Sequence, residues 1–462
     1  MKEKKMSDTH ANISDEFIEE ARESKEGKKF PLWQSWTVLV VSVATIIVLA
    51  FLISREKNQK AGTNVNVVYP KAYAFDDFNT SREVREQNPV DDNFIKALDE
   101  FTYKTSANIL TDAGKNINYS PISLYYALSL AASGAEGETK DQLLALLGVS
   151  DKEVLSEQCG NLYRRLYKDN EIGKVKIANS LWMDDEFKGK PIIFKDDFVR
   201  QAAENFYASS HSVDLASVKT GRDMADWISK NTNGRLTPSL EINPDQILSI
   251  INTVYFYDQW INRFDRSETA EDTFNLSNGS EVKVDFMNKT YGSAGFTRGK
   301  DFTRASLQLK NSGQMVFILP DEGVSPYELI ASSEKMKQTF EGGEGSYGEV
   351  VWRIPKFSFS SSLTLTNMLI NLGVTSAFTR DADFSGITDH LAYVTDVLQE
   401  TYIGIDEDGV EASAYTQINY AGAALPEGRA DMILDRPFIY GIITQNNTML
   451  FIGVCENPVS TK

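Results

Sequence analysis

Ile405 to Leu434 reads IDEDGVEASAYTQINYAGAALPEGRADMIL, a segment with the composition of a loop and the pattern of a strand. From Val410 to Ile418, every second residue is uncharged and mostly small, while the residues between them are polar or amphipathic. This two-residue period is typical of a strand with one buried face. No proline interrupts Gly409 to Leu425, so nothing prevents the backbone amides from joining a sheet. The pattern therefore predicts a segment that can exist as an exposed loop or as a strand within a sheet.

The residues that follow are small and flexible. Ala421 to Ala430 reads AGAALPEGRA, which indicates an exposed tip. A plainer interpretation of the whole segment is the edge strand of a hairpin, in which the alternation has no role in insertion. The pattern alone leaves both interpretations open.

The rest of the chain from about Asp91 to Pro458 has a mixed helical and extended pattern. Helical spacing is seen in two groups, Phe94, Ala97, Leu98 and Phe101, and then Leu124, Leu128 and Ala131 after Ser120-Pro121. Extended runs follow at Ile247 to Tyr257, Gln314 to Pro320, Glu349 to Pro355 and Phe438 to Ile443. Helices interleaved with long strands predict an α+β domain with large antiparallel sheets.

The segment DEDGVEASAYT, from Asp406 to Thr416, resembles the hinge of the serpin family, where an acidic pair, a glycine and a run of small residues precede the reactive loop. Other motifs similar to those of the family follow in order over residues 93 to 458. They are NINYSPIS (Asn116 to Ser123), SGAEGETKDQLLALL (Ser133 to Leu147), IANSLW (Ile177 to Trp182), WISKNTNGRL (Trp227 to Leu236), IINTVYFYDQW (Ile251 to Trp260), RIPKF (Arg353 to Phe357), LGVTSAFTRDADFSGI (Leu372 to Ile387), DRPFIYGI (Asp435 to Ile442) and LFIGVCENP (Leu450 to Pro458). The chain is identified as a serpin, of microbial type with an N-terminal membrane anchor.

The resemblance implies an α+β serpin fold with three mostly antiparallel sheets, about eight to nine helices and an exposed reactive-centre loop. It also implies that the chain is not an enzyme but a single-use inhibitor of serine-type endopeptidases. A target serine protease would attack the loop and form a covalent acyl-enzyme. The cleaved loop would then insert into the main sheet with the protease attached. Bulky or charged residues on the inward face of the hinge would resist that step.

Several residues take roles by this resemblance. The hinge comprises Glu407, Gly409, Val410, Glu411, Ala412, Ser413 and Ala414. Ser120, Ser123 and Asn252 correspond to the shutter beneath the main sheet, and Trp260 to the breach where insertion starts. The plainer roles are a helix N-cap for the serines and core packing for the tryptophan. Gln399 is also a shutter residue by the resemblance, and it stands where the family commonly has the shutter histidine. A glutamine can still donate and accept hydrogen bonds there, but it does not titrate, which argues against pH-dependent opening at that position.

The reactive bond is predicted between Ala423 and Ala424 from the family's usual spacing after the hinge. A small apolar residue there suits the shallow specificity pocket of elastase-like or subtilisin-like proteases. Leu425 precedes a proline and Arg429 lies far from the hinge, so both are poorer candidates.

The N-terminal part contains an uncharged, apolar run long enough to cross a bilayer, residues 32–53. Residues 1–31 would form a cytoplasmic tail, 54–92 a juxtamembrane linker, and 93–462 an extracellular serpin domain. The flanking cations favour this orientation only weakly. A cleaved signal peptide is the alternative, in which case the protein would be secreted.

Composition restricts the partners. The formal net charge of −18 argues against nucleic acid as a partner. Two distant cysteines and three scattered histidines predict no disulfide framework, no metal site and no cofactor. We expect a monomer that binds a target protease and a membrane. A non-inhibitory serpin that serves as a surface-tethered binding module is the alternative function.

Overall fold

A computed structural model describes residues 65, 67–111, 114–187, 189–240, 247–311, 313–395, 397–410 and 428–459. Within these residues no helix has the length and apolar character needed to cross a membrane. The predicted span, residues 32–53, lies outside them. Ten α-helices are present in the described part of the chain, slightly more than predicted. They are α3 (Phe78–Gln87), α4 (Asp92–Ile109), α5 (Pro121–Ser133), α6 (Gly137–Leu147), α7 (Lys152–Leu166), α8 (Asp196–Asn205), α9 (Val218–Asn231), α10 (Pro326–Leu329), α11 (Ser333–Glu341) and α12 (Thr366–Asn371).

The helices begin at local capping signals. The side chain of Asp91 accepts a hydrogen bond from the backbone of Asn93 at the start of α4. Ser120 caps α5, with Pro121 at the first helical position, as the Ser-Pro pair predicts. At the end of α6, Gly148 adopts a left-handed conformation with φ of 73°, which suits a residue without a Cβ. All three signals are local, and the Ser-Pro pair among them was predicted from the sequence.

The larger of two main sheets has nine strands. Its order is β1-β18-β17-β11-β10-β9-β12-β16, with β8 added to β9. The strands are β1 (Ile117–Tyr119), β8 (Ala270–Asn275), β9 (Glu281–Gly299), β10 (Phe302–Leu309), β11 (Gly313–Pro320), β12 (Glu344–Pro355), β16 (Gly428–Ile433), β17 (Phe438–Ile443) and β18 (Met449–Cys455). All pairs are antiparallel except β12 with β16.

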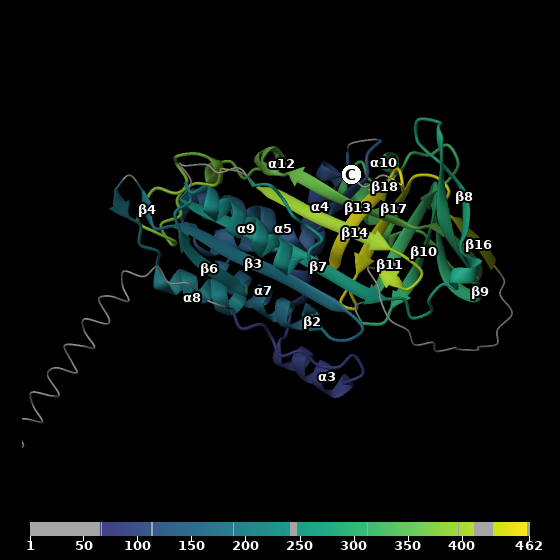
Figure 1. Cartoon of the computed structure of the whole chain (residues 1–462), viewed down its shortest axis with the longest axis horizontal. Helices are drawn as coiled ribbons and strands as arrows, with labels where there is room; N and C mark the ends of the chain where they lie inside the picture. Colours follow the sequence, from purple (N-terminus) through teal and green to yellow (C-terminus); the bar gives the residue numbers. More distant parts are fainter. Residues whose placement is uncertain are drawn as a thin grey trace, which may run out of the picture. The chain divides into compact units, whose positions relative to one another are not determined.

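The second main sheet has seven strands in the order β13-β14-β15-β7-β3-β2, with β6 also paired to β3 (Figure 1). The strands are β2 (Lys168–Asp169), β3 (Lys174–Asp184), β6 (Ala208–Val213), β7 (Leu248–Gln259), β13 (Phe357–Thr364), β14 (Leu398–Ile405) and β15 (Gly409–Val410). A hairpin of β4 (Glu186–Phe187) and β5 (Lys190–Pro191) is the third sheet. Three mostly antiparallel sheets with interspersed helices confirm the predicted α+β fold.

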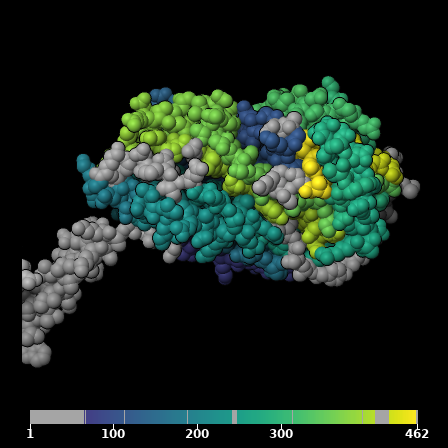
Figure 2. Space-filling view, turned by 45° about the horizontal axis from the view of Figure 1, so that its top comes forward, coloured from purple at the N-terminus to yellow at the C-terminus, as the bar shows by residue number. Residues whose placement is uncertain are grey.

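Helix α5 lies between the two main sheets and is buried almost throughout. Its Tyr125 contacts Phe94 and Phe101 of α4 edge-on, with ring centroids 5.7 and 5.1 Å apart. On the outer face of the seven-stranded sheet, α9 packs on β7 (Figure 1). Figure 2 shows the light green surface of the segment that includes β13 and β14 beside the teal surface of the segment that includes α9 and β7. The inner face of the seven-stranded sheet therefore packs on α5, and its outer face carries α9.

Part of the segment predicted as a linker is folded against this body. Tyr69 stacks on Tyr167 and Tyr207, with ring centroids 5.9 and 6.4 Å apart. The Nζ atom of Lys176 lies 4.4 Å from the Tyr69 ring centroid. Helix α3 follows and contacts α7. Residues 67–90 therefore form an ordered N-terminal strap ahead of α4.

Candidate functional site

In the part of the chain that the structure describes, two residues of β15 join the seven-stranded sheet at its centre. Gly409 and Val410 pair with Gln259 and Asp258 of β7, and Val410 also pairs with Ile405 of β14. Beyond these pairs, β7 and β14 share no ladder within the described residues. We call the facing edges of β7 and β14 the seam. A strand could be added there because both edges carry backbone donors and acceptors.

Gly409 is required by the close approach of two backbones at the top of the seam. A Cβ atom on this residue would lie 2.2 Å from the carbonyl oxygen of Asp258 and 2.7 Å from Cα of Gln259. Both atoms belong to the main chain, so they cannot move aside as a flexible side chain would. The glycine of the predicted hinge is therefore a steric necessity.

Val410 confirms the first inward position of the predicted alternation. Its side chain is 1% exposed and lies on the same face of the sheet as Asp258, its partner on β7. The other inward positions, Ala412, Ala414, Thr416 and Ile418, lie outside the described residues.

The edges of the seam are less covered than the neighbouring strand. Ile177 to Asp184 on β3 are all buried, whereas Leu248 to Asn252 on β7 are only half-buried. On the other edge, Leu398 is 58% exposed. Strands at the middle of a sheet normally have both edges covered, so this exposure marks the place where the described strands leave the sheet incomplete.

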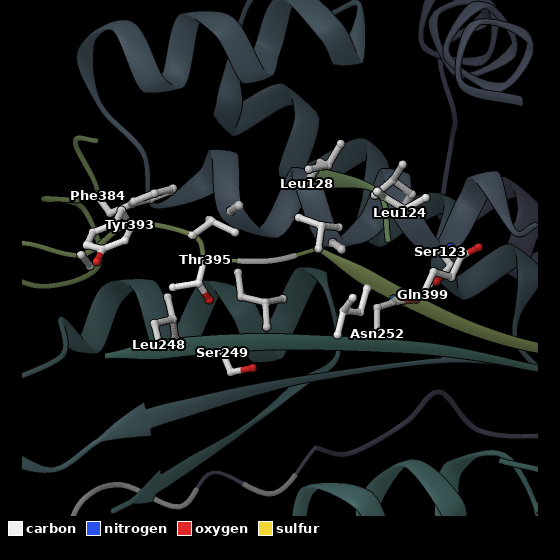
Figure 3. A pocket seen from close by; sticks show the side chains of 18 residues that line it. Ser123, Leu124, Leu128, Leu248, Ser249, Asn252, Phe384, Tyr393, Thr395 and Gln399 are labelled. Carbon is white, nitrogen blue, oxygen red and sulfur yellow. Dashed lines mark hydrogen bonds between the residues drawn. The ribbon is translucent and has the colours of Figure 1, made fainter. Parts of the chain in front are cut away.

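Beneath the lower part of the seam lies a cavity of about 90 Å³. Leu124 and Leu128 of α5 line it on one side, and Leu248 and Asn252 of β7 on the other (Figure 3). Gln399 lies at one end of this pocket, and Phe384 and Tyr393 lie at the other. Apolar side chains line the cavity together with the polar residues Ser249, Thr395 and Gln399, so it suits a short extended segment with mixed side chains.

Gln399 connects β14 to the start of α5. Its Oε1 atom accepts a hydrogen bond of 2.9 Å from the backbone N–H of Ser120, and its Nε2 atom donates one of 2.9 Å to the backbone carbonyl of Ser120. The Ser120 hydroxyl donates to the carbonyl of Leu450, 2.7 Å away, and also caps α5. The structure thus brings together two predicted shutter residues, Gln399 and Ser120. Both polar atoms of the Gln399 side-chain amide are bonded to the Ser120 backbone.

Ser123 connects α5 to β7. Its hydroxyl donates to Oδ1 of Asn252, and Nδ2 of Asn252 donates to Oδ1 of Asn179 on β3. Asn179 in turn donates to the carbonyl of Phe206, 2.5 Å away. Asn179 was not predicted from sequence. It lies 73 residues from Asn252 along the chain, so no local pattern could reveal the pair.

Trp260 fixes the turn that leads into β15. Its Nε1–H donates to the carbonyl of Asp406 over 2.9 Å, and its backbone N–H donates to the carbonyl of Asp408 over 3.1 Å. The side chain is 1% exposed. Trp260 is therefore both a core residue and a residue that bonds to the hinge.

Basic and polar side chains hold the last two residues of the acidic triplet Asp406-Glu407-Asp408. Asp408 forms ion pairs with Arg263 at 3.1 Å and Arg266 at 2.5 Å. Glu407 is 4% exposed and accepts from Thr269 at 2.8 Å and Lys356 at 3.2 Å. We call Asp406 and these contacts together the hinge clamp. Among its members, only Glu407 was predicted as a site residue.

The hinge clamp affects the two neighbouring carboxyl groups in opposite directions. Burial acts to raise the pKa of Glu407, but hydrogen bonds from its own backbone N–H, Thr269 and Lys356 outweigh it, so this pKa is lowered. Burial raises the pKa of Asp406, and the charges of Asp408 and Glu407 add to the effect. The clamp therefore combines one well-stabilised carboxylate with one poorly stabilised carboxylate.

Some predicted site residues remain outside the described part of the chain. They are Glu411, Ala412, Ser413 and Ala414 of the hinge and Ala423 and Ala424 of the reactive bond.

Comparison with known proteins identifies the family. Residues 96–458 match the family described as Serpin (serine protease inhibitor). The chain belongs to the serpin family. The seam is accordingly part of a serpin's main sheet, and the nine-stranded sheet packs behind it.

Individual serpins are similar over almost their whole length. Serpin-ZX of Arabidopsis thaliana is 28% identical over 394 residues, which is 79% of this chain and 98% of that protein. Human Serpin B11 is 28% identical over 392 residues, 78% of this chain and 97% of that protein. These relatives come from a plant and a mammal, so they support the family without singling out the microbial type.

A solved structure supports the fold. The thermophilic serpin tengpin in its native state is 26% identical, with a TM-score of 0.72 over 86% of this chain and 99% of that chain. The serpin fold predicted from the sequence is confirmed.

Proposed function

We propose that this serpin is a single-use inhibitor of serine-type endopeptidases whose loop enters the seam after cleavage. The observation that carries the proposal is the register of β15. Gly409 and Val410 are already paired with β7, and Val410 is also paired with β14, so the position of every later residue in an extended strand follows from them.

Extending the antiparallel register by six residues on both strands puts Thr416 between Asn252 and Gln399. These two residues belong to the hydrogen-bond network that connects the sheet to α5. Thr416 carries a hydroxyl, so it can donate to or accept from either amide.

Two residues further, the same register puts Ile418 between Ile250 and Val397, and Tyr420 between Leu248 and Thr395. All four partners line the cavity beneath the seam. An apolar side chain at position 418 would fill space bordered by Leu124 and Leu128. Under this register, two inward residues of the loop, Ile418 and Tyr420, would face the cavity.

A strand from Gly409 to Ala423 would be about fifteen residues and on the order of 50 Å long. It would satisfy backbone groups on both edges of the seam and bury one apolar face. Hydrogen bonds and burial favour this state over an exposed loop. A protease joined to the cleaved end as an acyl-enzyme would be carried along the sheet.

The proposed reactive bond is between Ala423 and Ala424, and the proposed targets are elastase-like or subtilisin-like proteases. A small apolar residue fits a shallow specificity pocket, whereas a trypsin-type pocket requires a cation.

Incubation with an elastase-like and a subtilisin-like protease tests the inhibitory function. We expect a protein–protease adduct that survives a denaturing gel, and a released peptide that begins at residue 424. Cleavage without an adduct would instead support the non-inhibitory alternative.

We further propose that the apolar residues 32–53 anchor the serpin domain outside the cell, in a membrane. Its support is the length and uncharged character of this run. Membrane fractionation with alkaline washing checks the proposal. Recovery of a soluble protein whose N-terminus lies beyond Ile53 would overturn it.

A further inference from the structure

A cationic pocket lies between the N-terminal strap and the body, away from the seam. Helix α3, the end of α7, β2 and the turn between β17 and β18 surround it. In Figure 1, α3 lies beside the end of α7 and β2. The cavity measures about 40 Å³, which is room for roughly three water molecules or one small ion.

Three positively charged side chains line this pocket: Arg85, Arg165 and Lys168. The other polar lining groups are neutral, and among the described residues no Asp or Glu contributes to the lining. Asp169 and Asp258, on neighbouring strands, have other partners. Asp169 pairs with Lys174 at 3.2 Å, and Asp258 accepts from the backbone N–H of Asn311 at 3.1 Å. The cations are thus concentrated without compensating carboxylates in the lining.

The contacts of Arg165 indicate that grouping these three cations is unfavourable without a bound anion. Its Nε–H is buried and has no hydrogen-bond acceptor within the described structure, and its only side-chain bond there is a long one of 3.5 Å to Asn446. Burial, and then the charge of Arg85, lower the pKa of Arg165. A buried donor without an acceptor is costly, so a ligand that accepts from Nε would stabilise the site.

Lys168 is held in place by Tyr73 of the strap. Its Nζ atom lies 4.4 Å from the Tyr73 ring centroid and also donates to the Tyr73 hydroxyl. The lysine and the two arginines therefore come from three different elements. Arg85 lies before residue 96, where the family match begins, so this pocket depends on a segment that the family match does not include.

We propose that this pocket binds a phosphate group and thereby fastens α3 to the serpin body. A tetrahedral oxyanion offers several acceptors to the guanidinium groups and the ammonium group at once. The net charge of −18 does not prevent this, because distant charges are screened within about 10 Å at 0.1 M salt. The pocket size suits a phosphate group rather than a large polyanion.

Titration calorimetry of the full chain with inorganic phosphate tests the proposal, with chloride as the reference ion. We expect one site per chain and a rise in the melting midpoint with phosphate. Absence of both effects would overturn the proposal.

Substitutions test the location. Arg85→Gln should weaken phosphate binding by about tenfold or more, since one charge-assisted contact is lost. Arg85 is exposed, so this change should not disturb folding. Arg82→Gln is the matched control because Arg82 is on the same helix, pairs with Glu86 at 4.0 Å and does not line the pocket. Equal weakening by both variants would contradict a specific pocket.

Two further ligands identify the source of the phosphate. Dimethyl phosphate mimics the diester of a phospholipid headgroup, and glycerol 3-phosphate is a soluble monoester. If dimethyl phosphate binds as tightly as inorganic phosphate, the pocket is assigned to a lipid headgroup. If dimethyl phosphate does not bind, the pocket is assigned to free phosphate or a monoester. The readout is independent of protease inhibition, so failure here leaves the inhibitory proposal untouched.

Discussion

Gln399 joins the sheet to α5 through a neutral amide. By the sequence resemblance, this position corresponds to a histidine that is common in the family. An amide donates and accepts at any pH, whereas a histidine titrates near pH 6.5. The reciprocal bonds to Ser120 therefore do not change between about pH 5 and 8. This serpin's sheet should open independently of pH at that position.

Replacing Gln399 with leucine removes both bonds and leaves the buried N–H of Ser120 without an acceptor. We expect Gln399→Leu to lower the free energy of unfolding by about 1–3 kcal/mol, as measured by urea denaturation. Gln87→Leu, at an exposed position on α3, is the control and should change it by less than about 0.5 kcal/mol. Equal stability of the two variants would contradict the role of Gln399.

The hinge clamp predicts opposite pH effects for adjacent carboxyl groups. The pKa of Glu407 is lowered in the folded state, so its contribution to stability is complete above the ordinary value of 4.5 and is lost as pH falls through the lowered value. The pKa of Asp406 is raised, so its ionised form destabilises the fold, and this cost disappears as pH falls.

Glu407→Gln should therefore lower stability at neutral pH and flatten the acid limb of the stability curve. Asp406→Asn should raise stability at neutral pH, because an amide keeps the Oδ1 acceptor for the backbone N–H groups of Asp408 and Gly409. Urea midpoints measured at several pH values check both. Shifts of the same sign in the two variants would refute this account of the clamp.

At the scale of elements, the hinge strand has one face that must be small and uncharged. The β15 register would put Ala412 between Phe256 and Ile403, both buried, whereas Ser413 would lie between Tyr255 and Tyr402 on the other face. Arg235 lies 5.3 Å from the Tyr402 ring, so a carboxylate at position 413 would find a cation nearby.

Ala412→Glu should convert the inhibitor into a substrate, because insertion would bury a charge without a partner. Ser413→Glu carries the same charge on the other face and should still trap protease. A gel assay for the protease adduct distinguishes the two. If Ala412→Glu retained full trapping, the register would be wrong.

The sequence was sufficient for features that are encoded locally. The Ser120-Pro121 pair marked the start of α5, and the alternation after Gly409 marked a strand whose first inward residue is buried. It was not sufficient for contacts between distant segments. Gln399 bonds to Ser120 across 279 residues, and Arg266 reaches Asp408 across 142. Only the fold brings such pairs together, so the hinge clamp and Asn179 could not be anticipated.

At the scale of the molecule, the structure combines a complete core with an incomplete sheet. The nine-stranded sheet and α5 are closely packed, while the two strand edges of the seam are paired, as far as the described residues go, only through Gly409 and Val410. Under the proposed function, insertion of the chain's own loop into the seam would give an arrangement of lower free energy. If the proposed insertion is correct, the native form is maintained kinetically until the loop is cut.

Calorimetry of the intact and the nicked chain tests this most directly. Cleavage at the reactive loop should raise the melting midpoint by more than about 10 °C, because the inserted strand adds hydrogen bonds and buries an apolar face. An unchanged midpoint, with residues 410–423 still open to a second protease after nicking, would contradict the account.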